Sequence, residues 1–202
     1  MKTAAVLAVL ALSITGAPQD SFKVDDEGFI RNWLVLAPIA SENEDAGAAE
    51  VDKEQVKDEA KLKPKAGDKA TAGGKELTWK AHKAADYFID FRASFGAERG
   101  EDVVGYAVAY VHADAEMTGL RILMGSNDEA KLYLNGKCVV KFESGRTIDK
   151  DQDAGENVTL VKGQNVIVFK VINEKNNWAG CVRFTDKAGA ALKTLKVTLA
   201  PQ

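Results

Sequence analysis

The chain has 202 residues, with 27 basic and 30 acidic side chains and a net charge of −3 at neutral pH. This length suits one domain and is marginal for two. A mildly acidic balance of mixed charge is a poor electrostatic match for nucleic acid, and the sequence has no basic helix suited to a membrane surface. We therefore expect neither a nucleic-acid partner nor a membrane partner.

The first 17 residues have the parts of a secretory signal peptide. Lys2 precedes an uncharged apolar run over residues 4–12, and the small residues Thr15 and Ala17 follow. The run is shorter than the roughly 20 residues that span a bilayer, so we expect no membrane span there. The alternative to a signal peptide is a buried N-terminal helix. We expect cleavage after Ala17, one mature domain over residues 18–202, and a secreted or periplasmic location without a membrane span.

The first half of the mature chain contains one strand and a long connection. Residues 30–39 are bulky and branched and end near Pro38, which favours a strand. Residues 41–75 have no aromatic side chain and too few apolar residues for a core of their own. Good helix formers predict a short surface helix over residues 48–62, and residues 65–75 are typical of a flexible loop. We interpret residues 41–75 as a helical and flexible connection within one domain.

The second half has the period-two alternation of β-strands. Asn135-Gly136 between two apolar runs is a strong hairpin signal, because both turn residues must adopt positive φ. About ten short strands, with one short surface helix in the connection, predict an all-β jelly-roll sandwich. The strands expected after the connection lie at residues 87–91, 103–111, 120–124, 130–134, 137–142, 158–160, 165–172, 181–185 and 195–199.

Cys138 and Cys181 are the only cysteines. An oxidising compartment favours a disulfide between them. Cys138 alternates with Val140, which predicts that it faces the core, whereas Cys181 alternates with Arg183 and is expected on the opposite face of its strand. Because a disulfide requires close Cβ atoms, both outcomes stay open: a disulfide, or two separate thiols of which at least one is buried.

Four stretches carry a resemblance to a known family. They are NWLVLAP at residues 32–38, GSNDEAKLYLNGK at 125–137, DKDQD at 149–153 followed by Leu160 and KGQN at 162–165, and WAGCVRF at 178–184. They resemble secreted, galactose-binding-like jelly-roll modules common in planctomycetes and other environmental bacteria. The resemblance implies a non-catalytic module of the carbohydrate-binding-module type, often associated with carbohydrate.

A sugar site is expected where an aromatic ring lies near amides or carboxylates, since the ring stacks on the apolar side of a sugar and the polar groups bind its hydroxyls. Trp178 with Asn176 and Asn177 forms one candidate. A second candidate combines Asn127 and Asp128 with Arg146. The alternative is that Trp178 packs over an edge of the sandwich while the amides satisfy turns.

Three alternating carboxylates form a candidate metal site. Asp149, Asp151 and Asp153 lie in one loop, and hard cations such as Ca²⁺ take oxygen ligands. The pattern departs from an EF-hand loop at Ala154, where glycine is required, and at Leu160, where an acid is required. Structural Ca²⁺ is one interpretation of this loop, and a solvated acidic loop is the other.

Catalysis finds little support in the sequence. His82 and His112 are the only histidines, and there is no nucleophile elbow, zinc-ligand spacing or phosphate-binding glycine loop. A small glycoside hydrolase would require two carboxylates that converge in a cleft. We expect a secreted, non-catalytic module that binds carbohydrate, and the alternative is a structural or protein-interaction domain of the cell envelope that docks a protein partner through residues 41–75.

Overall fold

A computed structural model describes residues 20–44, 47–95 and 100–202. The predicted signal peptide, residues 1–17, lies outside these residues. Within the described part, no helix is long and apolar enough to cross a membrane.

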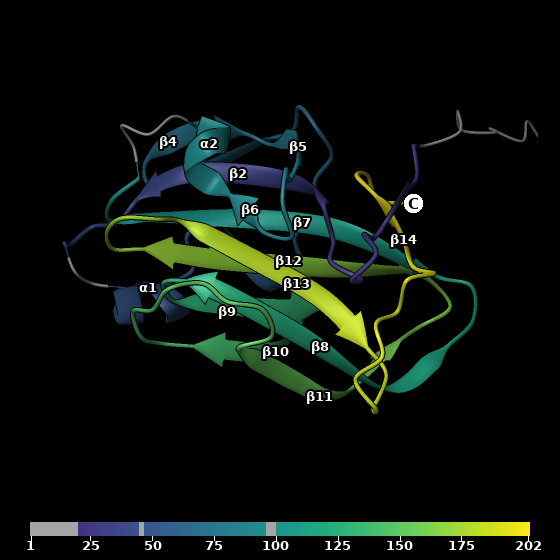
Figure 1. Cartoon of the computed structure of the whole chain (residues 1–202). Helices are drawn as coiled ribbons and strands as arrows, with labels where there is room; N and C mark the ends of the chain where they lie inside the picture. Colours follow the sequence, from purple (N-terminus) through teal and green to yellow (C-terminus); the bar gives the residue numbers. More distant parts are fainter. Residues whose placement is uncertain (1–19, 45–46, 96–99) are drawn as a thin grey trace, which may run out of the picture.

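Two antiparallel sheets form a sandwich, which confirms the all-β class expected from the sequence (Figure 1). The larger sheet contains β1 (Phe22–Lys23), β2 (Asn32–Ala40), β5 (Lys80–Lys83), β7 (Val103–Ala113), β9 (Ala130–Leu134), β10 (Lys137–Phe142), β12 (Gly163–Asn173) and β14 (Lys196–Thr198). The smaller sheet contains β6 (Ile89–Asp90), β8 (Met117–Asn127), β11 (Asp153–Leu160) and β13 (Ala179–Thr185).

The long strand β7 organises the larger sheet. β12 pairs along its whole length on one side, while β2 and β14 share the other side, each covering part of it. In the smaller sheet the order is β11-β8-β13-β6. Because β6 pairs only with the beginning of β13, residues from β6, β13 and the end of β8 meet at one end of this sheet.

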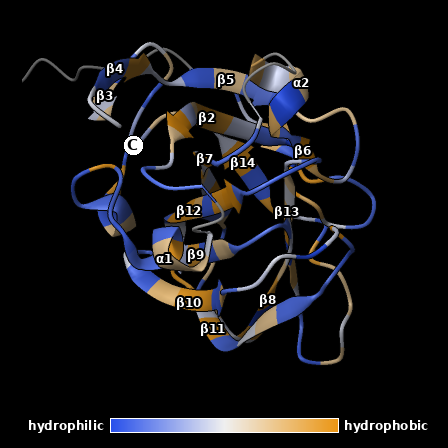
Figure 2. Cartoon of the chain, turned by 90° about the vertical axis from the view of Figure 1, so that its left-hand side faces the viewer, coloured by the Kyte–Doolittle hydropathy of each residue, from blue (hydrophilic) through white to orange (hydrophobic). Residues whose placement is uncertain are grey.

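The main core lies between the two sheets. Inward-facing side chains of β7, β12 and β13 alternate with residues on the other face, as the period of a strand requires. Trp33 is fully buried in this core, as the apolar run around it predicts. The hydropathy colouring in Figure 2 shows hydrophobic positions on the strands and hydrophilic positions on most connecting loops.

A third layer covers the outer face of the larger sheet. It consists of helix α1 (Gly47–Asp52), the 3₁₀ helix η1 (Glu59–Lys61) and the hairpin of β3 (Lys69–Ala72) and β4 (Lys75–Thr78). A second hydrophobic cluster joins this layer to the sheet. We call residues 47–78 the cover. The middle of the outer face of the larger sheet is therefore buried, and Trp79 beside the cover is 2% exposed.

Buried polar groups hold the cover to the sheet. The hydroxyls of Tyr106 and Tyr133 each donate to the Glu59 carboxylate at 2.5 Å. The Lys170 ammonium lies 3.2 Å from Glu59 and also donates to backbone carbonyls of the cover. Tyr110 donates to the carbonyl of Pro64 at 2.6 Å. The sequence analysis did not identify this network, because its members lie far apart in the chain.

Several local predictions need correction. The helix expected over residues 48–62 is two short pieces, α1 and η1, and both turn a buried side chain toward the sheet. The loop expected over residues 65–75 contains β3 and the turn to β4. The strand expected at residues 87–91 is limited to β6, because helix α2 (Phe91–Phe95) begins at Phe91. The Asn135-Gly136 hairpin is confirmed, with positive φ at both residues.

The two cysteines are separate free thiols, so the structure has the second of the two alternatives, two thiols of which one is buried. Cys138 is exposed rather than core-facing, because the pairing register of β10 shifts between Cys138 and Val140. Cys181 is the buried thiol of the two. Burial raises the pKa of the Cys181 thiol to about 12, which keeps it protonated at neutral pH.

Candidate functional site

Trp178 does not form the exposed sugar platform expected from the sequence. Its side chain is 1% exposed and stacks on Phe91 with ring centroids 4.8 Å apart. The indole N–H donates to the carbonyl of Val171 at 3.3 Å. A Cβ atom on Gly105 would lie 2.6 Å from the indole ring, so the ring packs directly against the backbone of β7. Trp178 is thus a core residue, as the alternative interpretation proposed.

A hollow of about 300 Å³ nevertheless lies beside Trp178, where β6, α2 and the beginning of β13 meet. We call it the Phe88 pocket. Its lining combines two aromatic side chains, two charged side chains, one amide and two aliphatic residues. These residues are Phe88, Asp90, Arg92, Ile148, Asn177, Trp178 and Ala179.

The aromatic wall of this pocket is Phe88, which is half-buried and packs edge-on against Tyr87 at a centroid distance of 5.1 Å. Asp90 is exposed and is positioned by its Oδ1 atom, which accepts the Ala93 backbone N–H at 2.9 Å. This bond fixes the first turn of α2 in the way that an N-terminal cap does. The pocket therefore places a carboxylate and a partly exposed ring on one short segment.

The opposite wall comes from the turn between β12 and β13. Asn177 lines the pocket, whereas Asn176 does not. Asn176 instead has positive φ, and its carbonyl oxygen accepts a hydrogen bond from Arg92. The first predicted sugar site consisted of Trp178, Asn176 and Asn177. In the structure Asn177 and Trp178 line the Phe88 pocket, whereas Asn176 forms part of the turn.

Sequence analysis missed Phe88, Asp90, Arg92 and Ile148. A signal was present in the alternating segment 86–92, where Phe88 falls on the same side as Asp86, Asp90 and Arg92. An aromatic residue on the polar side of a strand pattern indicates an exposed ring, and exposed rings mark binding surfaces more often than buried ones do. Ile148 gave no signal, because only the fold brings its loop to the pocket.

The second predicted group does come together, but as an internal network. Asn127 donates to the carbonyl of Arg146 at 2.7 Å, and the Arg146 backbone N–H donates to Asp128 at 3.1 Å. The Arg146 guanidinium also donates to Ser126, and its central carbon lies over the Phe142 ring, 3.6 Å from the ring centroid. These groups therefore stabilise the loop after β10. Asn127 pairs with Ala179 across β8 and β13, so the network adjoins the Phe88 pocket.

Glu129, next to this network, is an ionisable group with little access to water. It is 2% exposed, and among the described residues its Oε2 atom has no hydrogen-bond partner. Burial, together with the nearby carboxylates of Glu174 and Asp128, raises the pKa of Glu129 to about 7. At neutral pH a substantial fraction of Glu129 therefore carries a proton.

This raised pKa predicts a pH-dependent stability. The folded state binds the Glu129 proton more tightly than the unfolded state does, so stability is lost as the pH rises through about 7 and is fully present below about 4.5. We expect Glu129→Gln to raise the free energy of unfolding by roughly 1–3 kcal/mol at pH 8 and to have little effect at pH 4.5. Urea titrations of both proteins at the two pH values measure this difference. An equal effect at both pH values would contradict the assignment.

The three aspartates of the candidate metal loop do not converge. Asp151 accepts from the Arg183 guanidinium at 2.8 Å, and Asp153 pairs with Arg146. Asp149 accepts the backbone N–H of Lys150 at 2.7 Å. Across the described residues, no group of three or more His, Cys, Asp or Glu side chains could hold a metal ion. The geometry expected for structural Ca²⁺ at Asp149, Asp151 and Asp153 is absent, because two of the carboxylates neutralise arginines instead.

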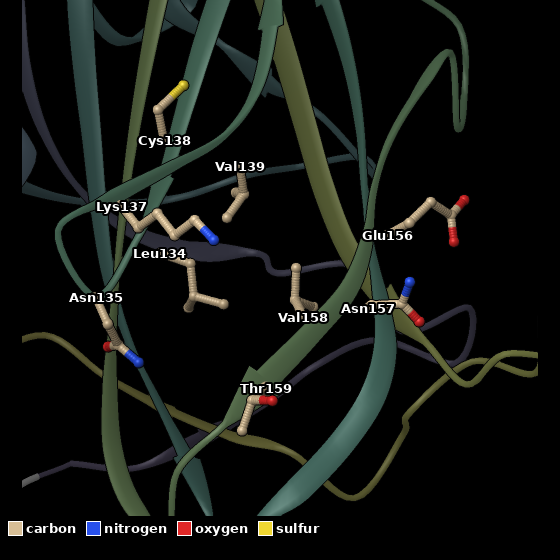
Figure 3. Close-up of a pocket in the computed structure, with 9 residues that line it drawn as sticks. All are labelled: Leu134, Asn135, Lys137, Cys138, Val139, Glu156, Asn157, Val158 and Thr159. Carbon is tan, nitrogen blue, oxygen red and sulfur yellow. The ribbon is translucent and has the colours of Figure 1, made fainter.

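A larger hollow of about 490 Å³ lies between β10 and β11, at the seam where the edges of the two sheets face each other (Figure 3). Leu134, Val139 and Val158 give it an aliphatic interior, and Lys137 reaches over Leu134 in Figure 3. Glu156 points away from these residues and is held by Arg121 at 2.9 Å. This hollow has no aromatic side chain, so it matches a sugar less well than the Phe88 pocket does.

Comparisons with known proteins identify no family. No protein-family model matches the chain, and no curated protein matches it. Among solved structures, a PA14 domain of the antifreeze protein MpAFP has a TM-score of 0.42 at 9% identity, covering 94% of this chain and 97% of that chain. A PA14 sugar-binding domain from an RTX adhesin has a TM-score of 0.38 at 9% identity, covering 82% and 96%.

A third solved structure is a GH26-CBM35 β-(1,4)-mannanase from Podospora anserina. Its TM-score is 0.27 at 12% identity, and the match covers 91% of this chain and 28% of that chain. Similarities of this size carry no argument about what this chain binds.

Proposed function

We propose that the chain is a non-catalytic carbohydrate-binding module and that a sugar unit binds in the Phe88 pocket. The observation that carries this proposal is the meeting, in one hollow, of a partly exposed aromatic ring, an exposed carboxylate and an exposed amide. We also propose that the module acts outside the cytoplasm, on the basis of the signal-peptide pattern in residues 1–17.

Each lining group has a defined task toward a sugar. The Phe88 ring offers an apolar face to the C–H groups of a pyranose, and Ile148 extends that apolar surface. The Asp90 carboxylate accepts hydrogen bonds from sugar hydroxyls, while the Asn177 amide both donates and accepts. This combination of an apolar surface with a few placed polar groups is the usual composition of a small-ligand site.

The size of the pocket limits what it holds. A hollow of about 300 Å³ lies at the lower end of the roughly 300–1,000 Å³ range of ligand pockets. We therefore propose that it receives one sugar unit, either a chain end or a side branch, rather than a long oligosaccharide laid across the sheet.

A glycan array with the purified full chain tests the proposal. We expect specific binding to a subset of glycans, and we expect Phe88→Ala and Asn177→Ala each to weaken that binding about tenfold, because each removes one stacking or hydrogen-bonding contact. Asn43→Ala is the matched control, since Asn43 is an exposed amide outside the pocket. Glycan binding that survives both pocket variants, or no glycan binding by the folded protein, would refute the proposal.

A further inference from the structure

One part of the cover, residues 57–75, carries a concentration of positive charge, although residues 47–78 as a whole have no net charge. Residues 57–75 contain six lysines and three acids, a net charge of +3, so the rest of the chain carries −6. One of the three acids, Glu59, is buried against Lys170 and contributes nothing to the surface. The six lysines are all exposed, and they are Lys57, Lys61, Lys63, Lys65, Lys69 and Lys75.

Three of these lysines form a regular row. Lys61 ends η1, and in the segment that follows Leu62 is half-buried and Pro64 is buried, so Lys61, Lys63 and Lys65 are the exposed alternate positions. Alternate residues of an extended chain lie about 6–7 Å apart. We call these three side chains the lysine row. No ion pair joins any of them to another described residue, whereas Lys69 on the neighbouring hairpin is paired with Glu76 at 2.6 Å.

The row sits on a rigid base. The Pro64 carbonyl accepts from Tyr110, and the Lys65 backbone N–H donates to Asp68 at 3.0 Å. On the other side of the row, Glu59 anchors η1 to the larger sheet. A row of charges whose backbone is already ordered loses less conformational entropy on binding than a flexible basic tail does.

We propose that the lysine row binds an anionic polysaccharide, a linear polymer with carboxylate or sulfate groups at a regular repeat. Fixed cations spaced along an extended segment complement fixed anions spaced along an extended polymer. This inference rests on the proposed function, because it identifies the class of carbohydrate, but it uses a surface separate from the Phe88 pocket.

Two other polyanionic partners fit the surface less well. Single-stranded nucleic acid binds through several aromatic side chains interleaved with basic ones. Near the row, Tyr110 and Trp79 are buried, and a single half-buried ring, Phe22, lines a hollow together with Lys65. A membrane-surface site requires apolar side chains that enter the lipid. Among the described residues the one exposed large hydrophobic side chain is Val161, which lies outside the cover.

The test measures binding of the full chain to polygalacturonate, with a neutral galactomannan as reference, at about 50 and 500 mM NaCl. We expect Lys61→Gln, Lys63→Gln and Lys65→Gln together to weaken polygalacturonate binding about tenfold at low salt. Screening at high salt should remove most of the difference. The matched control combines Lys187→Gln, Lys193→Gln and Lys196→Gln, which changes the charge equally at exposed lysines outside the cover and should change the affinity by less than about twofold.

The outcomes separate this inference from the proposed function. If the row variant loses polygalacturonate binding while Phe88→Ala retains it, the lysine row is supported and the pocket is not. If Phe88→Ala abolishes binding while the row variant keeps wild-type affinity, the row is overturned and the pocket is supported. Equal losses in the row variant and the control variant would also overturn the row. So would tighter binding to a DNA duplex or to phosphatidylserine vesicles than to polygalacturonate at the same salt.

Discussion

Lys170→Met is expected to lower the free energy of unfolding by about 3–5 kcal/mol, because it leaves the buried Glu59 carboxylate without its cation. Lys170 is fully buried, and Glu59 is 4% exposed. Burial lowers the pKa of the Lys170 ammonium, and Glu59 opposes that shift. Urea denaturation measures the loss, and a cost below about 1 kcal/mol would show that the pair does not stabilise the cover.

The double variant Lys170→Met with Glu59→Gln tests whether the two residues act as a pair. Removing both charges takes away the cost of burying them together with their mutual attraction. We therefore expect the free energy of unfolding to fall by less in the double variant than the sum of the decreases in the two single variants. Lys69→Met is the control, because the Lys69–Glu76 pair is exposed and exposed pairs contribute about 0–1 kcal/mol. Additive losses in the double variant would contradict the coupling.

Trp178→Ala is expected to lower the free energy of unfolding by about 3–5 kcal/mol, because it leaves a cavity and removes packing contacts. The indole stacks on Phe91 and packs against the backbone of Gly105, and both contacts are lost when the side chain is truncated. Trp178→Phe keeps most of the packing but leaves the Val171 carbonyl without its donor, so we expect a smaller loss of about 1–2 kcal/mol. Thermal or urea unfolding measures both losses.

Phe88→Ala is the control for Trp178→Ala, because Phe88 is only half-buried. We expect it to lose about 1 kcal/mol or less and to remain folded. A loss as large as that of Trp178→Ala would contradict the assignment of Phe88 to a pocket wall. The comparison also shows why a loss of glycan binding in Trp178→Ala would report unfolding rather than a lost contact.

Local sequence signals predicted the sandwich well. Strand propensity and the Asn135-Gly136 turn depend on neighbouring residues, and the structure has its long strands β7 and β12 at the expected runs of apolar residues, 103–111 and 165–172. The cover was harder to predict. Helix propensity favoured a continuous helix over residues 48–62, whereas the structure has two short pieces, α1 and η1. Glu59 in the second piece contacts Tyr106, Tyr133 and Lys170, and propensity does not account for such contacts with distant residues.

The candidate site shows the same limit. A tryptophan beside two asparagines has the composition of a sugar site, but composition does not reveal which side of the chain faces the core. Trp178 precedes β13 and enters the core, where Phe91 provides its stacking partner. The partly exposed ring is Phe88, from a different part of the chain. Only the pairing of β6 with β13 brings that ring to Asn177.

The indole N–H signals of the three tryptophans give the most direct test of sugar binding in the Phe88 pocket. Trp178 lines the pocket, whereas Trp33 and Trp79 are buried elsewhere and serve as internal references. During titration with a glycan that the array identifies, we predict a saturable shift of the Trp178 signal while the Trp33 and Trp79 signals stay in place. Binding that saturates without moving the Trp178 signal would contradict the account.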